Sequence, residues 1–182
     1  YDLSYYRSQV MLLDKYPIFF KGTIEDNMSR VTHNIGKNEL SHIFALTGFD
    51  EHLRKLPQGI HTPIDETASQ LAGGAASLLA LSRCLLANPK VLILDEFADS
   101  LDIDTRIKLQ DSFATIANDR TVIDAQNVIS HELDSISNYD KILVLDHGKL
   151  VGQGTHSSLV NSCEEYKLML EKEKKLSEIG EP

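Results

Sequence analysis

The most informative stretch of this sequence is Val91-Leu92-Ile93-Leu94-Asp95-Glu96. Its apolar residues predict a strand of a parallel sheet that is buried on both faces. Because ligands of open α/β sheets bind beyond the carboxyl ends of the strands, the two adjacent carboxylates suit a magnesium phosphate site. One carboxylate would position the metal, and the other would orient or deprotonate an attacking water. Taken alone, such a run is more often a strand followed by a helix-capping acid.

Segments on both sides of this strand strengthen the phosphate interpretation. Upstream, Leu71-Ala72-Gly73-Gly74-Ala75 opens an apolar helix predicted over residues 78–87. Glycines at a helix N-terminus let backbone N–H groups and the helix dipole face an anion, although they also serve as flexible hinges. Downstream, Ser100-Leu101-Asp102 follows the carboxylates, and Ser130-His131 ends another apolar run. A histidine such as His131 is by itself more often structural, so the order of the segments carries the argument.

The rest of the chain alternates strands and helices at both ends and is helical in the middle. Apolar runs predict strands over residues 9–13, 121–123 and 128–129, and another buried strand over 142–145. Spacing near 3.6 predicts helices between residues 23 and 56 and over 101–117, and Asp146-His147-Gly148 predicts a hairpin turn. The predicted organisation is an α/β core over residues 9–24 and 88–160, a helical subdomain over about 25–87, and a C-terminal helical tail over 164–182.

Composition indicates an ordinary globular protein. The chain has 182 residues, of which 42% are hydrophobic and 25% charged. A net charge of −9 without any basic stretch argues against a partner nucleic acid. No apolar run approaches the roughly 18 residues that span a bilayer. The two cysteines, Cys84 and Cys163, lack zinc-site spacing and suggest a reducing compartment, and the start at Tyr1 suggests part of a longer or processed protein.

Together the motifs resemble the C-terminal part of the nucleotide-binding domain of an ATP-binding cassette (ABC) transporter of the exporter type. Residues 71–83 resemble the family's signature and its helix, and residues 88–96 resemble its Walker B strand. Ala98–Asp102 is similar to the D-loop, and Ser130-His131 to the H-loop. The similarity extends over about residues 6–170 and includes these segments: residues 20–27 after the Q-loop, 56–66 before the signature, and 152–156 at the exporter's C-terminal turn.

The resemblance implies an α/β fold with a parallel-sheet, P-loop NTPase-like core and an inserted helical signature subdomain. It implies ATP and Mg²⁺ as cofactors, with Asp95 holding the metal and Glu96 and His131 acting in catalysis. Such domains dimerise head to tail around two ATP molecules and drive a transmembrane domain from the cytoplasmic face of a membrane. The residues that the resemblance assigns to nucleotide contacts are Leu71, Ala72, Gly73, Gly74, Ala75, Asp99, Asp102 and Lys15.

The sequence also departs from the family pattern. No Gly-x-x-x-x-Gly-Lys-Ser/Thr motif occurs, and because the family places this loop ahead of the Q-loop, it would precede Tyr1. We therefore expect this chain alone to bind ATP poorly. The Q-loop glutamine corresponds to Lys15, a positive donor that cannot serve as a neutral metal ligand. Ala72 and Ala75 replace the signature serine and glutamine, and loss of the serine hydroxyl removes a hydrogen bond to phosphate worth about 1.5–3 kcal/mol.

Three functional hypotheses follow. The first is an ATPase subunit of an exporter, favoured by Asp95, Glu96 and His131. The second is a degenerate cassette that regulates or supports an active partner, favoured by Lys15 and the two alanine substitutions. A general base contributes roughly 10²–10⁴-fold in rate, so retention of Glu96 weighs for the first. A DNA-repair or chromosome-structure ATPase, the third, is disfavoured by the exporter-like segments and the acidic balance.

The degraded signature leads to a prediction about assembly. In a homodimer both sites would carry the weakened signature. Pairing with a different subunit would complete this chain's own site with an intact signature and leave the facing site, completed by Ala72, weak. The sequence therefore predicts one half of a heterodimeric exporter, although Lys15, which falls in this chain's own site, argues the other way.

Overall fold

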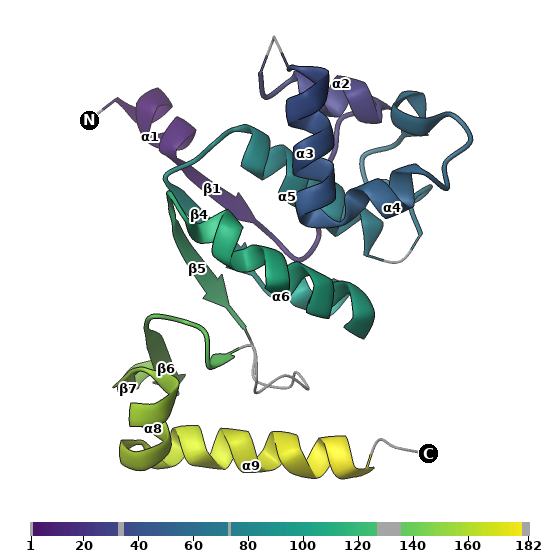
Figure 1. Cartoon of the computed structure of the whole chain (residues 1–182). Helices are drawn as coiled ribbons and strands as arrows, with labels where there is room; N and C mark the ends of the chain where they lie inside the picture. The colour runs from purple at the N-terminus through teal and green to yellow at the C-terminus, as the bar shows by residue number, and fades with distance from the viewer. Residues whose placement is uncertain (1, 33–34, 73, 127–135, 180–182) are drawn as a thin grey trace. The chain divides into compact units, whose positions relative to one another are not determined.

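The structure is a computed structural model that describes residues 2–32, 35–72, 74–126 and 136–179. The chain divides into two compact units, residues 1–126 and 127–182, and each unit is described by itself. The larger unit holds a parallel sheet and a group of helices, and the described part of the smaller unit includes a hairpin and helices α8 and α9 (Figure 1).

The sheet of the larger unit confirms three of the predicted strands. It consists of β1 (Val10–Leu13), β4 (Val91–Asp95) and β5 (Thr121–Ala125), all parallel, with β4 in the middle. Leu94 of β4 lies opposite Leu13 of β1 and Asp124 of β5. Burial of β4 on both faces is confirmed only in part, because Leu92 and Leu94 are buried whereas the alternate residues are half-buried. The predicted strand over residues 128–129 lies outside the described residues.

The helical middle of the chain is confirmed and is broken into short helices. Thr23 begins α2 (Ile24–Ser29) through a capping box in which its hydroxyl accepts from Asp26 N–H and the Asp26 carboxylate accepts from Thr23 N–H. Gly48, with φ +78°, ends α3 (Lys37–Thr47) and starts α4 (Phe49–Leu53). This unit also contains the antiparallel pair β2 (Gly22–Thr23) and β3 (Pro63–Ile64) and the short η1 (Gly59–His61). Helix α1 (Leu3–Gln9) was not predicted from the sequence pattern.

The central helix of this unit is α5 (Ala75–Leu86), which contacts both α3 and strand β1. Because it is enclosed in this way, its side chains are apolar on most faces, and Leu78, Leu79 and Leu81 are fully buried. Its polar Ser82 hydroxyl is paired with Thr47 Oγ1 of α3 at 2.7 Å. Cys84 is 4% exposed, and this burial raises the pKa of its thiol to about 11.

The smaller unit contains β6 (Ile142–Asp146), β7 (Lys149–Gly154), α8 (His156–Ser162) and α9 (Glu164–Ile179). The predicted hairpin is confirmed, with His147 and Gly148 at positive φ in the turn. The expectation of a buried strand over residues 142–145 is wrong, because β6 pairs antiparallel with β7 and Leu143 and Leu145 are 58% and 64% exposed. Its apolar cluster is small and is formed by Val144, Leu159, Cys163 and Tyr166.

Candidate functional site

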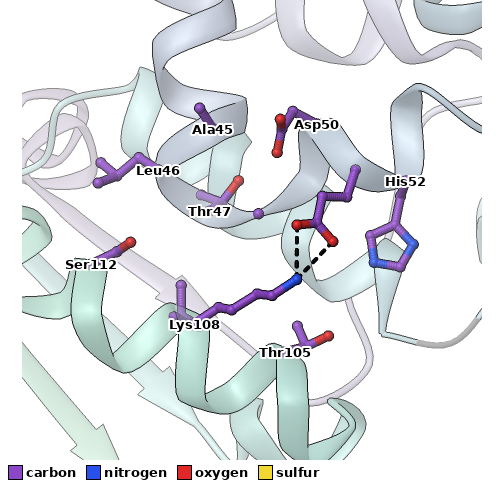
Figure 2. A pocket seen from close by; sticks show the side chains of 11 residues that line it. Ala45, Leu46, Thr47, Asp50, His52, Thr105, Lys108 and Ser112 are labelled. Atoms are coloured by element: carbon purple, nitrogen blue, oxygen red, sulfur yellow. Dashed lines mark hydrogen bonds and ion pairs between the residues drawn. The ribbon is translucent and has the colours of Figure 1, made fainter.

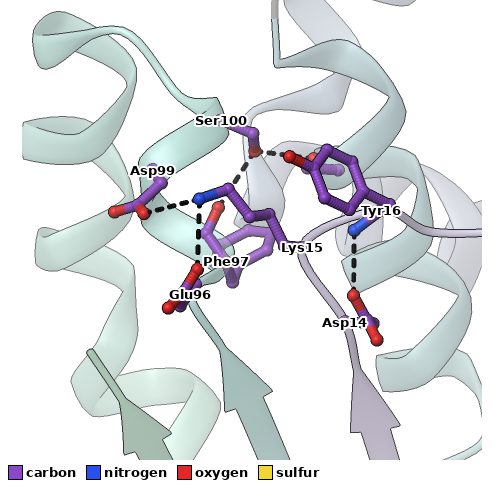
Figure 3. Close-up of polar contacts among 8 residues, drawn as sticks. Asp14, Lys15, Tyr16, Glu96, Phe97, Asp99 and Ser100 are labelled. Atoms are coloured by element: carbon purple, nitrogen blue, oxygen red, sulfur yellow. Dashed lines mark hydrogen bonds and ion pairs between the residues drawn. The ribbon is translucent and has the colours of Figure 1, made fainter. Parts of the chain in front are cut away.

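Asp95 and Glu96 lie at the carboxyl end of β4, the middle strand of the sheet, as the sequence predicted. Because β1 runs parallel beside β4, the chain that leaves β1 after Leu13 arrives at the same edge of the sheet. This arrangement brings Lys15 next to the segment that follows β4, which forms the 3-10 helix η2 (Phe97–Ser100) (Figure 3). The edge therefore collects charged side chains from two neighbouring strands.

The Lys15 ammonium bridges two of these carboxylates. Its Nζ donates to Asp99 Oδ2 at 3.0 Å and to Glu96 Oε2 at 3.1 Å (Figure 3). The side chains of all three residues are about one-third exposed, with relative exposures of 27–36%. The hydrogen bond to Asp99, followed by that to Glu96, raises the pKa of Lys15 well above its ordinary value. Lys15 is therefore a fixed positive charge in the site.

The backbone of Glu96 has an unusual conformation. Its φ of +49° places a non-glycine residue in the left-handed region, which is sparsely populated and costs energy. The turn is held because Glu96 N–H donates to Ala125 O of β5 at 2.9 Å and Asp99 N–H donates to Glu96 O at 3.2 Å. This turn ends β4 and brings the side chains of Glu96 and Asp99 close enough for both to contact the Lys15 ammonium.

Asp95 differs from its two acidic neighbours. Its carboxylate is exposed, and it has no recorded hydrogen bond or ion pair with another side chain in the part of the chain that the structure describes. Within those residues no group of three or more His, Cys, Asp or Glu side chains could hold a metal ion. Asp95 thus fits a magnesium ion as a single oxygen ligand, whereas Glu96 and Asp99, which share the Lys15 ammonium, do not fit one in this arrangement.

The signature-like segment packs against the segment that resembles the D-loop. Gly74 caps α5 with φ +38°, and a Cβ there would lie 2.8 Å from Leu101 Cδ2 and 3.3 Å from Ser100 O. Ser100 Oγ donates to Ser77 Oγ of α5 at 2.7 Å. Only glycine combines this backbone conformation with so close an approach, so Gly74 is required for the contact.

The other predicted site residues lie in varied surroundings. Leu71 is half-buried against the core and Ala72 is exposed, whereas Ala75 is 2% exposed and packs its methyl group inside the unit. Asp102 caps α6 (Ile103–Ala117) by accepting from Thr105 N and Oγ1 at 2.9 and 2.8 Å, which lowers the pKa of its carboxyl. Gly73 and His131 lie outside the described residues.

Sequence reasoning missed an organised turn just ahead of the signature-like segment. The Asp65 carboxylate accepts hydrogen bonds from both the N–H and the hydroxyl of Thr67 and of Ser69, at 2.6–3.1 Å, and another from Gln70 Nε2 at 3.1 Å. These bonds, the Ser69 hydroxyl first, hold the pKa of Asp65 far below its ordinary value. The signal was an aspartate followed two and four residues later by hydroxyl side chains, a pattern typical of local side-chain turns.

A shallow pocket also lies between the α3–α4 junction and α6 (Figure 2). Across it, Lys108 Nζ pairs with both carboxylate oxygens of Glu51 at 2.8 and 2.9 Å. The pair is exposed, and exposed ion pairs contribute little to stability. The ion pair joins α4 to α6. The pocket is lined by no residue that the sequence analysis assigned to a site.

The parallel sheet, the carboxylates beyond its middle strand and the glycine-capped helix define a nucleotide-binding α/β protein. A family model, "ABC transporter", matches residues 2–99, and the chain belongs to this family. The resemblance found in the motifs is thereby confirmed.

Individual relatives agree with this assignment. The chain is 34% identical over 159 residues to "Uncharacterized ABC transporter ATP-binding protein YknV" of Bacillus subtilis, covering 87% of this chain and 26% of that protein. It is 36% identical over 168 residues to "ATP-dependent lipid A-core flippase" of Haemophilus influenzae, covering 92% and 28%. A solved structure, "Structure of a bacterial Atm1-family ABC exporter with ATP bound", is 27% identical with a TM-score of 0.82, covering 92% of this chain and 29% of that chain.

These comparisons confirm the predicted fold class, an α/β P-loop NTPase-like domain of the ABC exporter type. The chain spans between about one-eighth and three-tenths of the length of the proteins it matches. None of its described helices is long and apolar enough to cross a membrane.

Proposed function

We propose that this chain is part of the ATP-binding domain of an ABC exporter that couples ATP hydrolysis to transport across a membrane. The observation that carries the proposal is the Asp95-Glu96 pair at the carboxyl end of the middle strand, in a fold that matches an ATP-bound exporter with a TM-score of 0.82. Ligands of open parallel sheets bind at this edge. The retained pair favours an ATPase over a purely regulatory partner.

The roles of the site residues follow from their chemistry. Glu96 is the general base that accepts a proton from the attacking water, and His131 completes the catalytic set. Asp95, exposed and unpaired among the described side chains, would hold magnesium that arrives with the nucleotide, and the metal would supply positive charge against the phosphates. Exposed Ala72 of the signature-like segment would face the nucleotide of a second domain.

The partners are a second nucleotide-binding domain and the transmembrane domain of the transporter, which places this chain at the cytoplasmic face of a membrane. Nucleic acid is not a partner, which is in keeping with the net charge of −9. Replacement of the signature serine by Ala72 supports pairing with a different subunit whose signature is intact. The dimer then has one strong and one weak ATP site.

The test is ATP hydrolysis by the full-length protein with its partner, reconstituted in lipid. Glu96→Gln removes the base and is expected to lower kcat by about 10²–10⁴-fold for the site it serves. Glu39→Gln, the same change at an exposed glutamate in the first turn of α3, is the matched control and is expected to leave the rate unchanged. Equal rates for the two variants would refute the assignment of Glu96.

A further inference from the structure

We propose that Lys15 is a built-in cation that takes the place of a divalent metal at Glu96 and Asp99, and so weakens the affinity of this sheet edge for magnesium. The inference concerns the chain's own charges. Its consequence for nucleotide, but not for metal, rests on the proposed function.

The geometry shows why one ammonium serves both carboxylates. Glu96 and Asp99 are held together by the turn in which Asp99 N–H donates to Glu96 O at 3.2 Å. Lys15 reaches them from the neighbouring strand, two residues after Leu13, whose register partner is Leu94 of β4. The two contacts of 3.0 and 3.1 Å are those of charge-assisted hydrogen bonds, which are stronger than neutral ones.

The edge needs a cation. Asp95, Glu96 and Asp99 place three carboxylates within five residues, and their negative charges repel one another. In most phosphate-binding sites a hard divalent cation offsets such charges through oxygen ligands. An ammonium group offers positive charge and donors but no lone pair, so Lys15 offsets part of the negative charge and cannot itself bind metal.

Lys15 and a metal ion therefore compete for the same carboxylate oxygens. The glutamine that the family places here would be neutral and would place no positive charge against either carboxylate. Substitution of Lys15 by glutamine removes one positive charge and its two ammonium contacts, at Glu96 Oε2 and Asp99 Oδ2, beside the exposed Asp95. The variant is expected to bind a divalent metal ion more tightly than the natural chain does.

The experiment measures Mn²⁺ binding by electron paramagnetic resonance to the 182-residue chain, without nucleotide. Lys15→Gln is expected to bind Mn²⁺ at least tenfold more tightly than the natural chain, and Lys15→Arg, which keeps the charge, to bind like the natural chain. Lys21→Gln, the same change at an exposed lysine outside the cluster, is the charge-matched control. Adding Glu96→Gln to Lys15→Gln should abolish the gain. Equal binding by the natural chain and Lys15→Gln, whether tight or absent, would overturn the proposal.

Circular dichroism checks that each variant folds. Lys15→Ala replaces Lys15→Gln if the latter does not fold, with the same expected gain in Mn²⁺ affinity. A second arm uses the full-length protein and a fluorescent ATP analogue, with magnesium or with EDTA. The affinity lost in EDTA should be at least tenfold greater for Lys15→Gln than for the natural protein. If the two proteins respond identically to EDTA, the role of Lys15 is contradicted. If the Mn²⁺ results are as expected but neither protein binds the ATP analogue, the proposed function alone is refuted.

Discussion

Lys15 and Asp99 are joined by a hydrogen bond of 3.0 Å although 84 residues separate them in the sequence. The contact exists because β1 and β4 are parallel neighbours, so the residues that follow each strand meet at one edge. The same ammonium holds Glu96, the proposed general base. Relations between elements far apart in sequence thus determine the electrostatics of the site.

Asp65 should contribute to stability in a pH-dependent way. Because folding lowers the pKa of Asp65, its stabilising effect is present above the ordinary aspartate pKa of about 3.9 and is lost as the pH falls toward the lower folded value. We expect Asp65→Asn to lower the free energy of unfolding at pH 7 and to have a smaller effect at pH 3. Urea unfolding at both pH values measures this difference. An effect that is equal at the two values would contradict it.

Replacing Gly74 should disrupt the contact between the signature-like segment and Leu101. Gly74→Ala adds a Cβ at 2.8 Å from Leu101 Cδ2 and strains a backbone with φ +38°, so it should destabilise the chain by about 1–3 kcal/mol. Gly48→Ala is the control, because Gly48 has φ +78° and nothing within 4 Å of the added atom. Thermal unfolding should show a larger loss for Gly74→Ala, and equal losses would mean that the packing contact contributes nothing.

Part of the candidate site could be predicted from the sequence, and part of it could not. The strand at residues 91–95 and its carboxylates were predictable, because an apolar run followed by acids is a local signal. The Lys15 bridge was not, since it depends on which strands are neighbours and on their register. The prediction that residues 142–145 form a buried strand was wrong, because the same apolar run can occur in a central strand of a sheet and in a two-stranded hairpin. The start of α5 at Ala75 depends on the left-handed Gly74.

The 182-residue chain on its own should hydrolyse no ATP. It contains no Gly-x-x-x-x-Gly-Lys-Ser/Thr loop, and backbone N–H groups of such a loop with its lysine bind the phosphates. A coupled assay of phosphate release by the purified chain measures this directly. Steady turnover that Glu96→Gln abolishes would show that another part of the chain replaces the loop.

Restoring the signature serine should strengthen the weak site of the assembled transporter. Ala72 is exposed, so Ala72→Ser adds a hydroxyl at low cost to packing. A hydrogen bond to a charged phosphate is worth about 1.5–3 kcal/mol, which corresponds to roughly 10–100-fold in ATP affinity at the facing site. Nucleotide titration of the heterodimer should show the gain at one of the two sites. Full ATPase and transport by the full-length protein without another subunit, with no gain from Ala72→Ser, would contradict the asymmetric dimer.

The central claim is that nucleotide phosphates bind at the carboxyl edge of β4. A cryo-electron microscopy map of the full-length protein with its partner, carrying Glu96→Gln and prepared with ATP and magnesium, tests this directly. We predict ATP at this edge, with its γ-phosphate beside the side chains of residues 95 and 96. A map with ATP bound elsewhere, or with this edge empty while the partner's site is filled, would contradict it.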